Sequence, residues 1–137
     1  MPGGLRLLGT ATILKAELGA GAGADIGSWL NGVPPVIGNL SATYTRSGIT
    51  LLGDLHYVGH RFTDVTTNSK LAAYAYGNLG GAYRFPGSAT TVSLDVLNVS
   101  QSKGLEEGNP RLTAAREVFL ARPVLPRRIT LSVRQTF

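Results

Sequence analysis

Residues 129–137 read Ile129-Thr130-Leu131-Ser132-Val133-Arg134-Gln135-Thr136-Phe137 and alternate between apolar and polar side chains with little interruption. Because successive side chains of a β-strand point to opposite faces, this alternation predicts a strand with one apolar and one polar face. The apolar face carries Ile129, Leu131, Val133 and Phe137, and the polar face carries Thr130, Ser132, Arg134 and Thr136.

Similar alternation recurs upstream of this stretch. It is visible in segments 36–45, 49–58, 76–85 and 91–99, which are separated by turn-forming residues. Segment 5–18 is a weaker sixth example. The sequence therefore predicts an all-β, antiparallel chain of about six strands.

The lengths of the connections alternate as well. Short connections occupy 46–48 and 86–89, whereas 17, 17 and 28 residues form the connections 19–35, 59–75 and 99–126. Outer-membrane β-barrels have short periplasmic turns at one end and long extracellular loops at the other. The pattern therefore predicts a segment of a transmembrane β-barrel, a partial barrel with its short turns on the periplasmic side.

The aromatic residues fall near predicted strand ends or in loops. Transmembrane barrels carry such residues in two girdles at the level of the lipid headgroups. The expected periplasmic group is Tyr44, Tyr83, Phe85 and Phe137, and the expected outer group is Tyr57, Phe62, Tyr74 and Tyr76, with Trp29 and Phe119 in the long loops.

Composition narrows the class of protein. Charged residues make up 15% of the chain, below the roughly 25% that is typical of soluble domains. There is no Cys, and no apolar run approaches the ~18 residues of a transmembrane helix. The net charge of +5 comes from scattered Lys and Arg without a basic stripe, which argues against a nucleic-acid partner.

The first 24 residues offer an alternative reading as a signal peptide. Arg6 precedes an apolar stretch, and small residues follow from Gly19 to Ala24. However, Lys15 and Glu17 stand between the apolar and small residues, which favours a strand.

Several segments in order resemble TonB-dependent receptors, the active transporters of the Gram-negative outer membrane. They are Gly32-Val33-Pro34 with Asn39-Leu40, 57–64 with 68–71 and Tyr74, Leu97-Asn98-Val99, 104–111, and 122–128 leading to the terminal Phe137. The resemblance implies a barrel of 22 strands with a plugged lumen that imports iron–siderophore complexes or similar scarce nutrients. It also implies energy supply by the TonB complex of the inner membrane.

The chain departs from that family in content and in detail. Residues 1–137 correspond to the C-terminal portion of the barrel, and the plug domain, through which the TonB complex acts, has no counterpart here. Gln135 stands where the family usually has an aromatic residue, and Ala72 stands where Pro is common.

Asp54, His56 and His60 are two and four residues apart, so a strand would place them on one face, the lumen, with Asp64 following in the loop. These residues suggest a metal site or a contact with a polar substrate. The simpler alternative is the ordinary polar wall of a barrel lumen, and we expect no metal or cofactor.

Two further groups are candidates for binding. Glu106, Glu107 and Arg111 lie in the longest predicted loop, either as a ligand gate or as a solvated surface. We expect Arg122, Arg127 and Arg128 at the outer end of the last strand, either to pair with lipid phosphates or an anionic ligand, or to reach water. The resemblance implies an assembly signal, read by the barrel-insertion machinery, in Ile129, Leu131, Val133 and Phe137.

No arrangement of residues predicts an enzyme. There is no Cys, the two His lie four residues apart, and no Ser occupies a Gly-x-Ser-x-Gly turn. The leading hypothesis is a component of an outer-membrane transporter. The alternative is a small outer-membrane structural or binding protein that transports nothing.

Overall fold

The computed structural model describes residues 3–19, 27–63, 70–112 and 117–136, and the side chains of 109–119 lie outside the description. Every regular element in these residues is a strand, as the sequence predicts. In chain order the strands are β1 (Gly4–Ile13), β2 (Val36–Arg46), β3 (Ile49–Val58), β4 (Arg61–Phe62), β5 (Lys70–Leu71), β6 (Tyr74–Arg84), β7 (Thr90–Leu97), β8 (Leu105–Leu112), β9 (Glu117–Pro123) and β10 (Arg128–Gln135).

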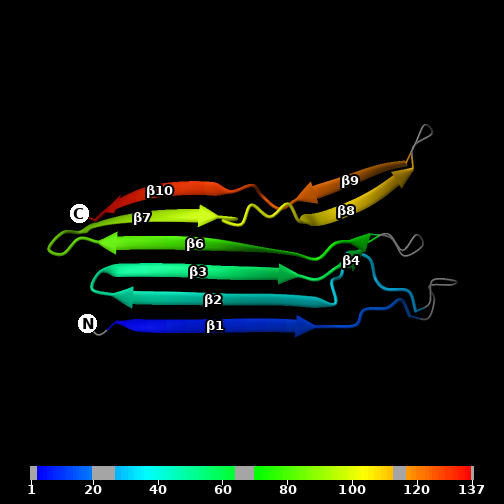
Figure 1. Cartoon of the computed structure of the whole chain (residues 1–137), viewed down its shortest axis with the longest axis horizontal. Coiled ribbons are helices and arrows are strands. Elements are labelled where there is room, and N and C mark those ends of the chain that lie inside the picture. Colours follow the sequence, from blue (N-terminus) through cyan, green and yellow to red (C-terminus); the bar gives the residue numbers. More distant parts are fainter. Residues whose placement is uncertain (1–2, 20–26, 64–69, 113–116, 137) are drawn as a thin grey trace.

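Six strands form one antiparallel sheet in the order β1-β2-β3-β6-β7-β10, which confirms the predicted number and direction. The pairs β4–β5 and β8–β9 form separate two-stranded sheets. The two short turns and both ends of the chain lie at one end of the sheet, and the longer connections lie at the other (Figure 1). We call these the turn end and the loop end.

The pairing register separates the two faces of the sheet by polarity. Paired residues share a face, so the row Leu131↔Leu94, Leu94↔Gly81, Gly81↔Leu51 and Leu51↔Tyr44 crosses five strands on one side. On the other side Thr130 pairs with Asp95, Asp95 with Gly80, and Gly80 with Leu52. We call these the apolar face and the polar face. Leu8 and Leu52 are the two leucines of the central rows that fall on the polar face.

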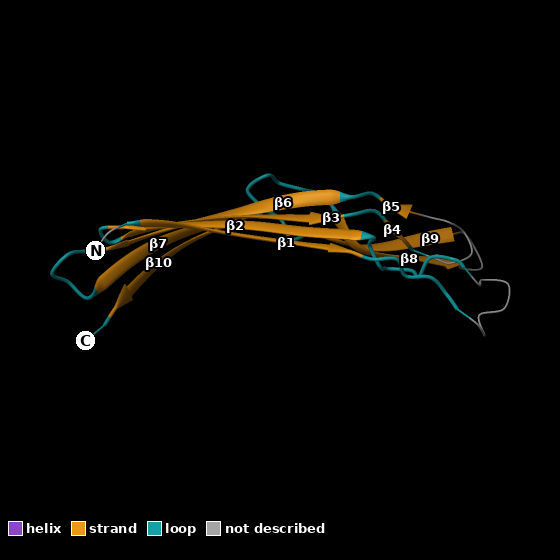
Figure 2. Cartoon of the chain, turned by 90° about the horizontal axis from the view of Figure 1, so that it is seen from below, coloured by secondary structure: helices purple, strands orange, loops and turns teal. Residues whose placement is uncertain are grey.

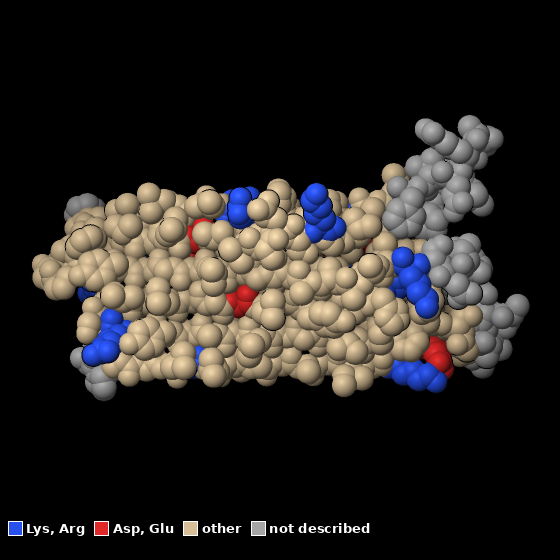
Figure 3. Space-filling view, viewed as in Figure 1, with Lys and Arg blue, Asp and Glu red and all other residues tan. Residues whose placement is uncertain are grey.

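Within the described residues, neither face of the six-stranded sheet is covered by a second layer. Figure 2 shows a single bowed sheet, and only isolated charged patches interrupt the surface of the strands in Figure 3. Among the described residues, the buried apolar side chains are Leu71 and Val124, both outside the six strands. Leu131, by contrast, is 69% exposed. A soluble domain buries its apolar face against another element, so this face needs lipid or a further partner.

The apolar face has the height of a membrane span. From Ile49 to Tyr57 there are eight residue steps, and at ~3.4 Å per step they cover ~27 Å along the strand. A tilt of 35–45°, usual for such barrels, reduces this to ~20 Å across the membrane, near the ~25 Å apolar band of known barrels. Among the described residues, no helix offers an apolar stretch long enough to cross a membrane.

Three predictions need correction. The predicted loop 99–126 contains the hairpin β8–β9, and 59–75 contains β4 and β5. The first strand ends at Ile13 rather than Leu18, although Glu17 still bridges to Trp29. In the predicted outer girdle, Tyr57 lies on the apolar face, but Tyr74 and Tyr76 pair with Val58 and His56 and therefore lie on the polar face.

Candidate functional site

The polar face carries a chain of side-chain hydrogen bonds that crosses four strands, β1, β2, β3 and β6. It begins on β1, where the Asn39 amide nitrogen donates to Thr10 Oγ1 at 3.2 Å. Asn39 Oδ1 lies 2.7 Å from His56 Nδ1, and His56 Nε2 lies 2.6 Å from Asp54 Oδ1. The Asn78 amide then donates to Asp54 Oδ1 at 2.7 Å. We call this set the polar ladder.

The ladder continues to Asn98, whose backbone N–H donates to Asn78 Oδ1 at 2.9 Å. Because a backbone N–H can only donate, Asn78 must present its oxygen to Asn98 and its amide nitrogen to Asp54. At the other end, the ring nitrogens of His56 contact Asn39 Oδ1 and Asp54 Oδ1, so the ring joins β2 to β3. Tyr76 stacks on that ring with 4.9 Å between the centroids.

Asn98 is the most extensively bonded side chain of the site. It directly follows β7, is 3% exposed and has a φ of 49°. Its Oδ1 accepts from the Ser102 N–H at 2.8 Å, and its Nδ2 donates to the carbonyls of Ser102 at 3.0 Å and Leu125 at 2.8 Å. The residue therefore fixes both the turn after β7 and the segment that leads into β10.

Arg61 forms a second joint at the loop end, between β4, β6 and the hairpin β8–β9. It is 3% exposed, its Nη2 donates to the carbonyl of Leu105, and its guanidinium carbon lies 5.4 Å from the centroid of the Tyr74 ring. A Cβ on Gly104 would lie 2.3 Å from Tyr74 Cγ, so only glycine fits there. Within the described part of the chain, Arg61 Nη1 is buried without a hydrogen-bond partner.

A pocket of about 430 Å³ opens beside this joint. Arg61, Glu106, Glu107 and Arg122 contribute its charged lining. Arg122 Nε lies 3.4 Å from Glu106 and its Nη2 lies 3.6 Å from Glu107, so these charges largely balance. A pocket with this lining suits a polar ligand with several hydrogen-bonding groups.

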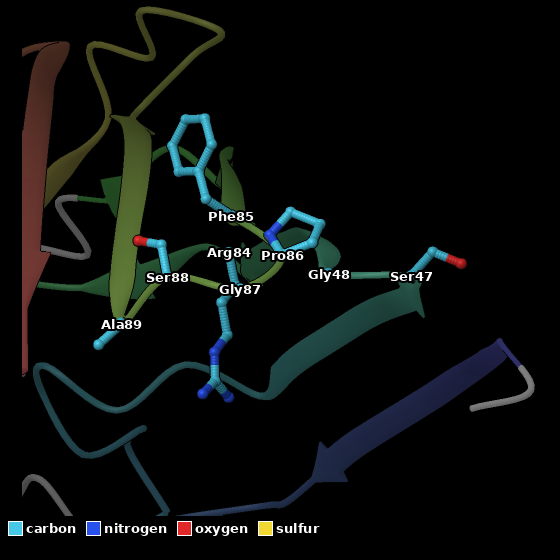
Figure 4. Close-up of a pocket in the computed structure, with 8 residues that line it drawn as sticks. All are labelled: Ser47, Gly48, Arg84, Phe85, Pro86, Gly87, Ser88 and Ala89. Atoms are coloured by element: carbon cyan, nitrogen blue, oxygen red, sulfur yellow. The ribbon is translucent and has the colours of Figure 1, made fainter.

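A larger groove of about 680 Å³ lies at the turn end between the turn Ser47–Gly48 and residues 84–89 (Figure 4). Arg84 and Phe85 point to opposite sides of the chain there, as their positions on the two faces require (Figure 4). Ser88 Oγ donates to Thr90 Oγ1 at 2.7 Å and accepts from the Thr90 N–H at 2.9 Å, which closes the turn.

The structure unites some predicted site residues and separates others. Asp54 and His56 are in direct contact, but His60 is exposed and follows the end of β3, with its ring 6.3 Å from that of Phe62. Asp64 lies outside the described residues. In the part of the chain that is described, no three His, Cys, Asp or Glu residues converge in a manner that would hold a metal ion.

The charged residues of the predicted longest loop lie in a hairpin instead. Glu106, Glu107 and Arg111 belong to β8, although the side chain of Arg111 lies outside the description. Arg122 belongs to β9 and pairs with carboxylates, so it does not stand at the outer end of the last strand as predicted. Arg127 is exposed just before β10, and Arg128 begins that strand on the polar face, in register with Leu97.

The C-terminal strand has the predicted alternation. Ile129, Leu131 and Val133 are exposed on the apolar face, in register with Val96, Leu94 and Val92. Phe137 lies outside the described residues. The roles of Asn98 and Arg61 were not predicted. The available signal for Asn98 was an Asn near the end of the predicted segment 91–99, because Asn tolerates positive φ and can therefore end a strand in a turn.

A single antiparallel sheet with one apolar face, one polar face and loops of unequal length at its two ends is a section of a transmembrane β-barrel wall. The sequence matches the family described as TonB dependent receptor-like, beta-barrel over residues 4–99. The chain belongs to this family, whose members are receptors and transporters of the Gram-negative outer membrane. No curated protein matches the sequence.

Two solved structures share the fold. One is the ferric-catecholate import receptor Fiu of Escherichia coli K12 in its closed form, with a TM-score of 0.72 and 20% identity. The other is BauA, the ferric preacinetobactin receptor of Acinetobacter baumannii, with a TM-score of 0.76 and 22% identity. Each comparison covers 94% of this chain but only 18% or 19% of the other protein. The chain thus spans about a fifth of these receptors.

Proposed function

We propose that the chain forms part of the wall of an outer-membrane receptor for TonB-dependent uptake of an iron–siderophore complex or a similar scarce nutrient. The observation that carries the proposal is the position of the loop-end pocket relative to the polar ladder. Asn98 links the two, because its backbone N–H joins the ladder while its side chain holds Ser102 and Leu125 at the base of β8–β9. A ligand in the pocket would then enter along the polar face.

The chemistry of the candidate residues supports this direction of entry. The pocket supplies guanidinium donors from Arg61 and Arg122 and carboxylate acceptors from Glu106 and Glu107. The polar face continues it with Tyr76, His56 and Asp54, where the Tyr76 ring stacks on His56 and His56 contacts Asp54. The names of the two similar structures, both receptors of ferric complexes, agree with a ligand of this kind. The TonB complex would act through a plug region outside this sequence.

Assembly is the second part of the proposal. Ile129, Leu131 and Val133, with the terminal Phe137, would be read by the barrel-insertion machinery, and the apolar face would then contact outer-membrane lipid. If so, deletion of Phe137 lowers the amount of receptor inserted while uptake per inserted molecule stays the same. Equal insertion with and without Phe137 would contradict the assembly role.

Uptake by the full-length protein tests the main proposal. In Gram-negative cells without their own siderophore receptors, we expect accumulation of radioactive iron supplied as a ferric catecholate or a related complex, and we expect it to require TonB. Replacing residues 105–123 by a short Gly-Ser linker should weaken ligand binding at least ~10-fold without lowering insertion, because it removes Glu106, Glu107 and Arg122, three of the four charged residues of the pocket lining.

A matched variant separates binding from assembly. Leu131→Arg should lower the amount inserted and leave binding per inserted molecule unchanged, which is the reverse of the hairpin replacement. Uptake that persists without TonB, or binding that survives loss of the hairpin, would contradict the proposal. Insertion without any ligand binding would instead favour the non-transporting structural protein.

A further inference from the structure

Charged residues are divided very unequally between the two faces of the six-stranded sheet. The strands β1, β2, β3, β6, β7 and β10 contain seven Arg and Asp residues. Six of them share the polar face, according to the pairing register, and one lies on the apolar face. The six are Arg6, Asp54, Arg84, Asp95, Arg128 and Arg134, and the seventh is Arg46.

Arg46 stands at the turn-end border of the apolar face. It pairs with Ile49, which pairs in turn with Tyr83, so the guanidinium belongs to the same cross-strand row as a tyrosine. Tyr44 precedes it by two residues on the same face, and Tyr83 packs edge-on against Phe85 with 4.9 Å between the ring centroids. Aromatic rings in this arrangement favour the headgroup level of a bilayer.

Arg46 is exposed, and no protein group in the described part of the chain pairs with its guanidinium. Its stem lies close to Gly3, the residue just before β1. A Cβ at Gly3 would lie 2.9 Å from both Cβ and Cγ of Arg46, so a glycine there leaves room for the stem. An arginine that is positioned at a lipid border but lacks a protein acceptor presents its planar donors to the surroundings.

We propose that Arg46 binds the phosphate of a phospholipid headgroup in the leaflet at the turn end, with Tyr44 and Tyr83 flanking the headgroup. A guanidinium donates two parallel hydrogen bonds to phosphate oxygens, and the phosphodiester is the anionic group found at the level of the aromatic girdle. This inference rests on the membrane location in the proposed function. It assigns the lipid-phosphate contact to the end of the barrel opposite Arg122, Arg127 and Arg128.

Lipid retention by the full-length protein tests the site. The protein is placed in nanodiscs of phosphatidylcholine with a minor fraction of phosphatidylglycerol, and lipids that remain bound are counted by native mass spectrometry after release into detergent. Arg46→Gln should weaken the binding of the most tightly retained phosphatidylglycerol molecule about fivefold. This corresponds to the ~1 kcal/mol that one basic residue contributes at an anionic surface. Arg46→Lys should retain part of the binding, since lysine keeps the positive charge but lacks the two parallel N–H donors of the guanidinium.

Arg134→Gln is the matched control, because Arg134 is also near the turn end but on the polar face, in register with Thr91. It should leave retention unchanged. Equal loss in both variants would mean a general effect of net charge and would overturn the proposal, as would no loss in Arg46→Gln. Displacement of the lipid by inorganic phosphate at millimolar concentration would assign the site to a free anion instead.

Insertion is scored separately from retention. A wild-type protein that does not enter bilayers would overturn both the proposed function and this inference. Normal insertion with unchanged lipid retention in Arg46→Gln would overturn the inference alone. If Arg46→Gln itself fails to insert, the Arg46→Lys variant tests whether the guanidinium binds the lipid phosphate. Lipid retention equal to that of the wild type in Arg46→Lys would contradict a contact made by two parallel N–H donors.

Discussion

At the scale of single residues, Asn98 has the clearest structural role. Asn98→Ala would leave the Ser102 N–H and the carbonyls of Ser102 and Leu125 without their present partners. Because Asn98 is buried, we expect the free energy of unfolding to fall by about 2–4 kcal/mol, with roughly 1–3 for the lost bonds and the rest for alanine at positive φ. Urea unfolding of the full-length protein in detergent micelles, followed by tryptophan fluorescence, measures this change.

Gln101→Ala is the control for Asn98→Ala. Gln101 also has a positive φ, 54°, but its side chain is exposed and forms no described hydrogen bond. It should therefore cost well under ~1 kcal/mol, because glutamine and alanine pay about the same penalty at positive φ. Similar losses in the two variants would show that the hydrogen bonds of Asn98 do not fix this turn.

Residue chemistry also explains what the sequence could reveal about the site. Asp54 and His56 were predictable together, because the period of a strand places residues two apart on one face. Their partners Asn39 and Asn78 come from β2 and β6, and only the register brings them into contact. A single sequence shows which residues of a strand share a face. It carries little information on how far two neighbouring strands are shifted along each other when that shift is an even number of residues, because the same faces then stay polar.

At the scale of elements, the six strands with one apolar and one polar face were predictable from the sequence, and the hairpin β8–β9 was not. Its first strand reads Leu-Glu-Glu-Gly-Asn-Pro-Arg-Leu, with two adjacent acids, a glycine and a proline. Alternation arises only where one face is apolar and the other polar, and a hairpin beyond the sheet has no such requirement. Residues 105–112 and 117–123 therefore resembled a loop by composition although they pair as strands.

The alternation of β10 predicts a difference between neighbouring substitutions. Leu131→Arg places a charge near the middle of the apolar face, where it should cost about 2–4 kcal/mol in a bilayer. Ser132→Arg places the same charge on the polar face, opposite Ser93, and should cost little. The measurement is the fraction of folded receptor in purified outer membranes, read from heat-modifiable migration in gels. Equal damage from both variants would mean that β10 has no lipid-facing side.

At the scale of the whole molecule, stability must come from the surroundings of the sheet. In the described part of the chain, the buried apolar residues are Leu71 and Val124, which lie outside the six strands, and the strand leucines are widely exposed. Among the described strands, β1 and β10 each pair on one side only, which leaves two open edges. Open edges and an exposed apolar face both favour association with other chains.

Residues 1–137 expressed alone should consequently not remain monomeric in water. We expect inclusion bodies on expression, and aggregation within minutes when the chain is diluted from urea into buffer, because no internal core offsets the conformational entropy of folding. Dilution into detergent micelles should increase the soluble fraction and give a β-type circular dichroism spectrum, since micelles cover the apolar face. Light scattering and sedimentation velocity distinguish the aggregated chain in buffer from the soluble chain in micelles. A monodisperse monomer that unfolds cooperatively on heating in plain buffer would contradict the assignment of the apolar face to lipid, because such behaviour requires a core that the described residues do not form.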